Sequence, residues 1–88
     1  MWITGQVWDE HGGPLAGVTI ELSHDELFNM IRRVVTDAEG RYVVLDLKPG
    51  TYCIRFSREG FSTAIREAMV FAEGLVSTVC TQLKSVKL

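Results

Sequence analysis

Apolar and polar residues alternate along most of this 88-residue chain, with the period of two that half-buried β-strands show. The clearest runs are residues 18–22 and 51–57. Alternate side chains of a strand point to opposite faces, so the apolar members of both runs lie on one side. We therefore predict one central core that contains Val18, Ile20, Leu22, Tyr52, Ile54 and Phe56.

Five further segments alternate less regularly: residues 2–8, 30–36, 41–45, 62–71 and 75–83. Turn-forming residues separate all seven runs at intervals of about 8–12 residues, a spacing typical of sandwiches and barrels. The connections are too short for the helical crossovers of a parallel sheet. The pattern predicts an all-β fold, a seven-stranded antiparallel Greek-key β-sandwich, as a single domain over residues 1–88.

Two of the connecting segments carry more specific expectations. Asp37 can accept hydrogen bonds within its own turn, and Gly40 can adopt a positive φ, so residues 37–40 predict a tight hairpin. Residues 23–31 do not alternate, which leaves a helical turn or a loop with exposed Leu27 and Phe28. We prefer the loop.

Composition excludes several classes of protein. The chain is 47% hydrophobic and 23% charged, as expected of an ordinary soluble globular domain. Its net charge is −2 and its basic residues are scattered, so we expect no nucleic-acid partner. The apolar stretches are too short to span a bilayer, and no basic start precedes an apolar segment. We therefore expect neither membrane insertion nor an export signal within the chain.

Catalytic and metal-binding patterns are missing from the sequence. The only histidines, His11 and His24, lie in polar loops without the short spacing of zinc ligands. No Gly-x-Ser-x-Gly motif is present, and no histidine lies near the serines of the β-runs, Ser57, Ser62, Ser77 and Ser85. Acidic residues in the turns lack a calcium-loop pattern and are interpreted as turn-forming and solvated carboxylates: Asp9, Glu10, Asp37 and Glu39. We expect no cofactor and no enzymatic activity.

The two cysteines, Cys53 and Cys80, fit neither a zinc nor a redox motif. Free cysteines usually behave as small apolar residues, so two free thiols are the preferred interpretation. The alternative, one disulfide bridge, would favour an oxidising compartment.

Longer strings of the sequence resemble a known family. Residues 3–22 (ITGQVWDEHGGPLAGVTIEL), 35–42 (VTDAEGRY) and 47–61 (LKPGTYCIRFSREGF) are similar to the carboxypeptidase regulatory-like domain family, which has a transthyretin-like or collagen-adhesin B-type sandwich. Residues 66–83 look especially like bacterial members of that family. The resemblance extends from Ile3 to about Leu83, and it rests on the order and spacing of turns and strands.

The resemblance implies a non-enzymatic accessory domain of a periplasmic or extracellular protein, with a neighbouring domain or copies of itself as partner. It also implies structural roles: tyrosines in the core at Tyr42 and Tyr52, and turns or close backbone approaches at Gly5, Gly13, Gly17, Gly40, Gly50 and Gly60. Related sandwiches in pili carry a Lys-to-Asn isopeptide bond that starts in the first strand. That crosslink is not available here, since the lysines are Lys48, Lys84 and Lys87 and the single asparagine is Asn29.

The two tryptophans are the most unusual feature of the first run. Ile3 and Val7 match the inward positions of the family, so Trp2 and Trp8 share the outward face with Thr4 and Gln6. Exposed aromatics serve as structural cover, as protein contacts or as platforms for sugars. Six residues along a strand separate the rings by roughly 20 Å, which is long for adjacent sugars.

The resulting hypothesis is a structural or protein-interaction module, with a carbohydrate-binding module as the alternative. The candidate interaction surface consists of Trp2, Trp8, Leu27 and Phe28. No charge lies between Met1 and Asp9, so the first strand would have little protection against pairing with another chain if it lay at a sheet edge.

Overall fold

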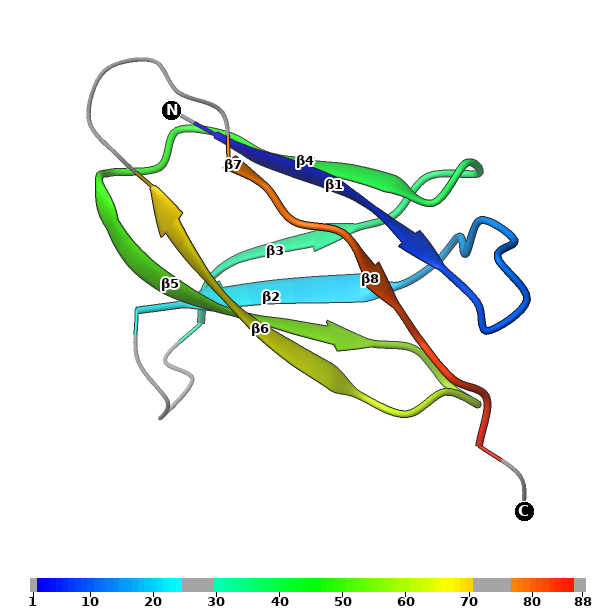
Figure 1. Ribbon diagram of the computed structural model, residues 1–88. Helices are drawn as coiled ribbons and strands as arrows, with labels where there is room; N and C mark the ends of the chain where they lie inside the picture. Colours follow the sequence, from blue (N-terminus) through cyan, green and yellow to red (C-terminus); the bar gives the residue numbers. More distant parts are fainter. Residues whose placement is uncertain (1, 25–29, 71–76, 87–88) are drawn as a thin grey trace.

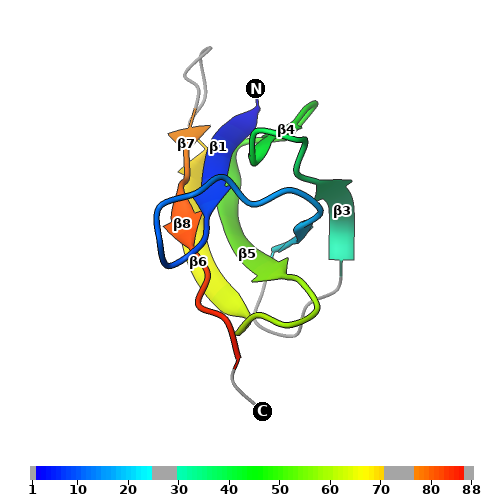
Figure 2. The same ribbon diagram turned by 90° about the vertical axis from the view of Figure 1, so that its right-hand side faces the viewer.

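The computed structural model describes residues 2–24, 30–70 and 77–86, which form two stacked β-sheets (Figure 1). One sheet has the order β4-β1-β7, with β8 also paired to β1; its strands are β1 (Ile3–Trp8), β4 (Arg41–Val44), β7 (Ser77–Thr78) and β8 (Thr81–Gln82). The other has the order β3-β2-β5-β6; its strands are β2 (Thr19–Ser23), β3 (Met30–Val35), β5 (Gly50–Ser57) and β6 (Ala64–Val70). Figure 2 shows the two layers from one end. The predicted all-β sandwich is confirmed.

The core lies between the sheets, where the sequence pattern places it. Ile20 pairs with Phe56 and Leu22 with Ile54, and all four side chains are fully buried. The other predicted core residues, Val18 and Tyr52, are buried in the same cluster. The alternation of β2 and β5 therefore assigned this core correctly.

Strand β1 lies inside its sheet rather than at an edge. It pairs with β4 on one side and with β7 and β8 on the other. Ile3 and Val7 are fully buried, which confirms the inward face predicted for this strand. The condition under which the uncharged first strand would be open to another chain, a place at a sheet edge, is therefore not met.

The final predicted run, 75–83, forms two short strands rather than one, so the described residues contain eight strand segments. Both β7 and β8 run parallel to β1, which corrects the prediction of an entirely antiparallel sandwich. The chain reaches them from the other sheet, and such a connection does not impose the antiparallel direction that a hairpin does. The Greek-key connection stays a prediction.

The break between β7 and β8 has a local cause at Val79. Its amide donates to the Thr4 carbonyl at 2.9 Å, while its own carbonyl accepts the Tyr42 hydroxyl at 2.5 Å. A carbonyl turned toward the core cannot continue a regular ladder. A Cβ at Gly5 would overlap this carbonyl, so glycine is required where Tyr42 passes β1.

The turn at residues 37–40 is tight, but it does not close a hairpin. Gly40 has φ +75° and its amide donates to the Asp37 carbonyl at 3.0 Å; Asp37 Oδ1 accepts from the amides of Glu39 and Arg41. The strands on either side, β3 and β4, belong to different sheets. The Gly40 carbonyl accepts the Val7 amide at 2.8 Å, and this bond directs the chain onto β1 instead of back along β3.

Candidate interaction surface

The outward side of the β4-β1-β7 sheet carries the largest apolar side chains that the described residues expose together. Thr4 pairs with Val43, and the same register continued by one residue places Trp2 beside Leu45. Trp2, Val43 and Leu45 are 41%, 48% and 58% exposed. We use the name uncharged face for the residues of this side other than Arg41, which is exposed opposite Gln6: Trp2, Thr4, Gln6, Trp8, Val43, Leu45, Thr78 and Gln82.

Three polar side chains of the uncharged face, those of Thr4, Gln6 and Gln82, are bonded to backbone carbonyls within the domain. Thr4 Oγ1 donates to the Tyr42 carbonyl at 3.1 Å, and Gln6 Nε2 donates to the Glu39 carbonyl at 2.9 Å. Gln82 Nε2 likewise donates to the Asp9 carbonyl at 2.8 Å. Groups that are already paired lose little when a partner excludes water, so covering this face carries a small desolvation cost.

The structure brings together only part of the surface predicted from the sequence. Trp2 and Trp8 share the uncharged face, with Trp2 exposed and Trp8 partly buried. Leu27 and Phe28 lie outside the described residues. Sequence reasoning missed Val43 and Leu45. The sequence contained a signal for them, because side chains alternate along a strand: if Tyr42 and Val44 point inward, Val43 and Leu45 point outward.

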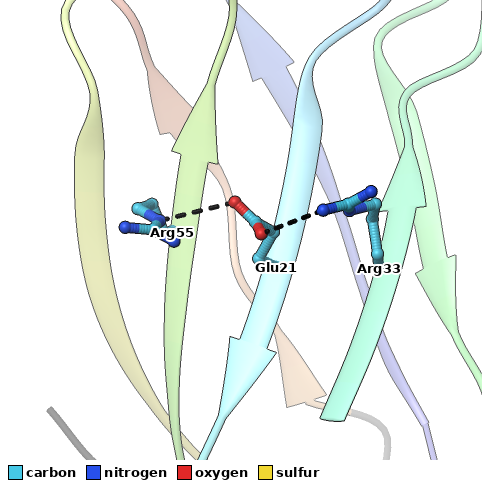
Figure 3. Close-up of polar contacts among 3 residues, drawn as sticks. All are labelled: Glu21, Arg33 and Arg55. Carbon is cyan, nitrogen blue, oxygen red and sulfur yellow. Dashed lines mark ion pairs between the residues drawn. The ribbon is translucent and has the colours of Figure 1, made fainter. Parts of the chain in front are cut away.

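The outward side of the other sheet is charged. Glu21 on β2 lies between Arg33 on β3 and Arg55 on β5, at 3.6 Å and 3.4 Å (Figure 3). The Glu21 side chain is only 15% exposed, whereas the two arginines are 59% and 37% exposed. A partner covering this ladder would have to strip water from the exposed guanidinium groups. The centre of this side is therefore suited to solvent, although Val35, Ile65 and Met69 are exposed on its edge strands β3 and β6.

The acidic turn residues hold loops together. Asp9 Oδ1 accepts the amides of His11 and Gly13, both at 2.9 Å, and these two bonds hold the pKa of Asp9 below its ordinary value. The Glu10 carboxylate accepts the hydroxyl and amide of Ser85, which lowers the pKa of Glu10. For Asp9 and Asp37 the turn-forming interpretation is confirmed. Within residues 2–24, 30–70 and 77–86, no three metal-ligating side chains gather.

Two other features lie away from the uncharged face. A pocket of about 250 Å³ contains Tyr52, whose hydroxyl donates to the Lys48 carbonyl and whose ring lies 4.7 Å from that of His24. Cys53 is partly buried and Cys80 is exposed, and no disulfide joins them in this structure. Neither the pocket nor the two cysteines bring a nucleophilic side chain close to a base.

The fold is that of a small β-sandwich domain with two different outward faces. Within the described residues, no set of side chains forms a catalytic centre. The sequence model of the carboxypeptidase regulatory-like domain family matches residues 2–84, and the chain belongs to this family. Over 55 residues it is 42% identical to serine-aspartate repeat-containing protein D of Staphylococcus aureus. That match includes 61% of this chain but only 4% of the relative.

Solved structures share the fold at low sequence identity. The major pilin subunit BcpA of Bacillus cereus superposes with a TM-score of 0.75 at 17% identity, over 93% of this chain and 28% of the pilin. Catechol 1,2-dioxygenase from Pseudomonas arvilla superposes with a TM-score of 0.72 at 18% identity, over 100% of this chain and 53% of the enzyme chain. The sandwich therefore occurs in both structural and enzymatic proteins, and the likeness shows the fold alone. The described residues contain no helix long and apolar enough to cross a membrane.

Proposed function

We propose that this domain is a non-catalytic structural module that makes protein contacts through its uncharged face. The observation that carries the proposal is the contrast between its two sheets. One outward side exposes Trp2, Val43 and Leu45 beside one another, whereas the other exposes Val35, Ile65 and Met69 on its edge strands, around an Arg-Glu-Arg ladder. Several large apolar groups gathered on one side of a small domain are typical of an association surface.

The relatives support a role at the bacterial surface. A serine-aspartate repeat protein and a major pilin subunit contain regions similar to this chain, and the chain spans only a small part of each. We infer an accessory domain of an extracellular or periplasmic protein, or a self-associating subunit. Its partner is then a neighbouring domain or a further copy of itself.

A carbohydrate-binding role has less support from the geometry. Trp8 is partly buried, so Trp2 is the single well-exposed aromatic of the face within the described residues. A stacking platform for adjacent sugars requires a second exposed ring at short range. Saturable binding on a polysaccharide array, lost in Trp2→Ala, would favour this alternative over protein contact.

The two tryptophans make the uncharged face easy to observe, because the chain contains no others. We expect the sedimentation coefficient to rise with protein concentration and the tryptophan emission to shift to shorter wavelength, since Trp2 loses water on association. Trp2→Ala combined with Leu45→Ala should weaken both changes. Val35→Ala combined with Ile65→Ala removes equally exposed side chains, 56% and 53%, from the charged sheet and should leave both unchanged. If the control pair weakens association as strongly, the assignment of the face is wrong.

A further inference from the structure

The pocket of about 250 Å³ beside Tyr52 lies where the chain passes from one sheet to the other. Its lining comes from the connection between β4 and β5, the end of β2, the start of β3 and β5 itself (Figure 1). Leu47 and Tyr52 in this lining belong to the buried core, and Ile31 packs against that core. The buried part of the lining is therefore largely apolar.

The exposed part of the lining carries an excess of positive charge. Arg32 and Lys48 are cations, and Asp46 is the one carboxylate among the lining residues that the structure describes. With His24 neutral, two cations against one carboxylate give these residues a positive formal charge, although the whole chain has a net charge of −2. Within the described residues no ion pair joins Asp46 to either cation. Both cations are thus available to an anion.

A β-bulge turns two neighbouring residues of β3 toward this pocket. Leu22 pairs with Arg32, and the next pair is Ser23 with Met30. Ile31 is therefore an extra residue on β3. In a regular strand Ile31 and Arg32 would point to opposite faces, but here both line the pocket. The bulge places an apolar side chain and a cation next to each other.

Arg32 has a counterpart at the opposite margin of the same sheet. Arg32 on the edge strand β3 pairs with the buried Leu22, and Arg66 on the edge strand β6 pairs with the buried Ile54. Both arginines are exposed, and each donates to the carbonyl of the residue before it. Charges at inward positions block the pairing of a further strand, because that strand would bury them. Edge protection alone thus accounts for Arg66.

Arg32 makes a contact that Arg66 lacks. Its Nη1 donates to the Ile31 carbonyl at 2.8 Å, and its Nη2 also donates to the Asp46 carbonyl at 3.4 Å. These bonds fix the guanidinium group at the pocket and leave its other N–H groups for a ligand. A side chain that is held in place before binding loses little conformational entropy when a ligand arrives.

We propose that this pocket binds a small organic carboxylate. Arg32 and Lys48 hold the anionic group, because guanidinium and ammonium groups form charge-assisted hydrogen bonds with carboxylates. The apolar part of the ligand packs against Ile31, Leu47 and Tyr52. Sites for drug-sized molecules have volumes of roughly 300–1,000 Å³, so this smaller pocket fits one ring or one amino-acid side chain. A free acid and a glutamate side chain of a partner's peptide segment both offer this chemistry.

Benzoate is a suitable probe, since it joins a carboxylate to one apolar ring, and benzamide has nearly the same shape without the charge. In a titration followed by heteronuclear NMR, benzoate should shift the amide resonances of His24, Arg32 and Lys48 along a saturable curve. We expect a dissociation constant on the order of 1 mM. Benzamide should bind about tenfold more weakly, because it lacks charge-assisted hydrogen bonds. Equal affinity for the two probes would overturn recognition of an anion.

Matched variants test the two cations. Arg32→Gln and Lys48→Gln should each weaken benzoate binding about tenfold. Arg66→Gln is the control for Arg32, because Arg66 has the same inward edge position and the same backbone bond. Lys84→Gln is the control for Lys48, since both lysines are exposed. Both controls should bind like the wild type, and circular dichroism with the denaturant midpoint shows that each variant is folded. An equal loss in Arg66→Gln would reduce the effect to net charge and overturn the site.

A blocked Gly-Glu-Gly peptide, with Gly-Gln-Gly as its neutral match, separates the two sources of the carboxylate. Saturation of the same resonances by the glutamate peptide assigns the group to a segment of a partner protein, and binding of benzoate alone assigns it to a free acid. Shifts that stay linear up to about 50 mM of both probes, well beyond the millimolar range, would overturn the proposal. Trp2→Ala, which tests the uncharged face, should leave benzoate binding unchanged. The proposed function and this inference therefore fail separately.

Discussion

Replacement of Gly5 by alanine tests the contact that interrupts the last strand. Gly5 lies on β1 opposite Tyr42, and the tyrosine side chain passes it to reach Val79. A Cβ at this position would overlap the Val79 carbonyl oxygen and lie 2.7 Å from both Cε1 and the hydroxyl oxygen of Tyr42. Because these are a backbone atom and a buried ring, neither can move aside cheaply.

The expected effect has two parts. Forcing a methyl group into a packed site costs about 1–3 kcal/mol through backbone and rotamer shifts. Displacing the Tyr42 hydroxyl leaves the Val79 carbonyl without its partner, which costs about 1–3 kcal/mol more. We therefore expect Gly5→Ala to lower the free energy of unfolding by about 2–6 kcal/mol, a large share of the roughly 5–15 kcal/mol typical of domains.

Urea-induced unfolding of four proteins measures this coupling: wild type, Gly5→Ala, Tyr42→Phe and the double variant. Tyr42→Phe alone should cost about 1–3 kcal/mol, because it removes the same hydrogen bond. The loss of unfolding free energy in the double variant should be smaller than the sum of the two single losses, by about 1 kcal/mol or more. Gly13→Ala is the control, since the nearest atom to its Cβ is an Asp9 carboxylate oxygen at 3.1 Å. Strict additivity, or a Gly5→Ala midpoint equal to that of the wild type, would refute the reasoning.

Three further predictions concern the core and the turns. Phe56→Ala should reduce the free energy of unfolding by about 3–5 kcal/mol, since Phe56 is fully buried; an unchanged denaturant midpoint would contradict its place in the core. Gly40→Val should cost more than the roughly 1 kcal/mol of an ordinary glycine replacement, because φ is +75° and a Cβ would lie 2.5 Å from the Val7 carbonyl oxygen; thermal melting measures this. The pKa of Asp9 is lowered from 3.8 in the folded state, so its stabilisation is present above pH 3.8 and is lost as pH falls through the folded pKa. Asp9→Asn should thus lose less stability than the wild type between about pH 5 and pH 2; equal slopes would contradict the assigned hydrogen bonds.

The sequence by itself determined the faces of the strands. Alternation reports which side chains point inward, because a strand reverses side-chain direction at each residue. Phe56 and Ile20 were assigned to the core on this basis, whereas the inward place of Ile3, and with it the outward place of Trp2, followed from the resemblance to the family. Turn chemistry also located the positive φ of Gly40, since a glycine following an aspartate turn is a local signal.

Neighbours across the sheets were decided only by the tertiary structure. The pattern of β1 contains nothing about which strands lie beside it, so its central place between β4 and β7 was not predictable from its lack of charge. In the sequence pattern Val79 is an ordinary strand residue. In the structure its carbonyl points inward, because it accepts a hydrogen bond from the Tyr42 hydroxyl, 37 positions away in the chain. Likewise, Arg32 and Arg66 become edge-blocking charges only once their strands are placed at the margins of one sheet. Local sequence sets the direction of each side chain, whereas long-range hydrogen bonding and packing decide what that side chain meets.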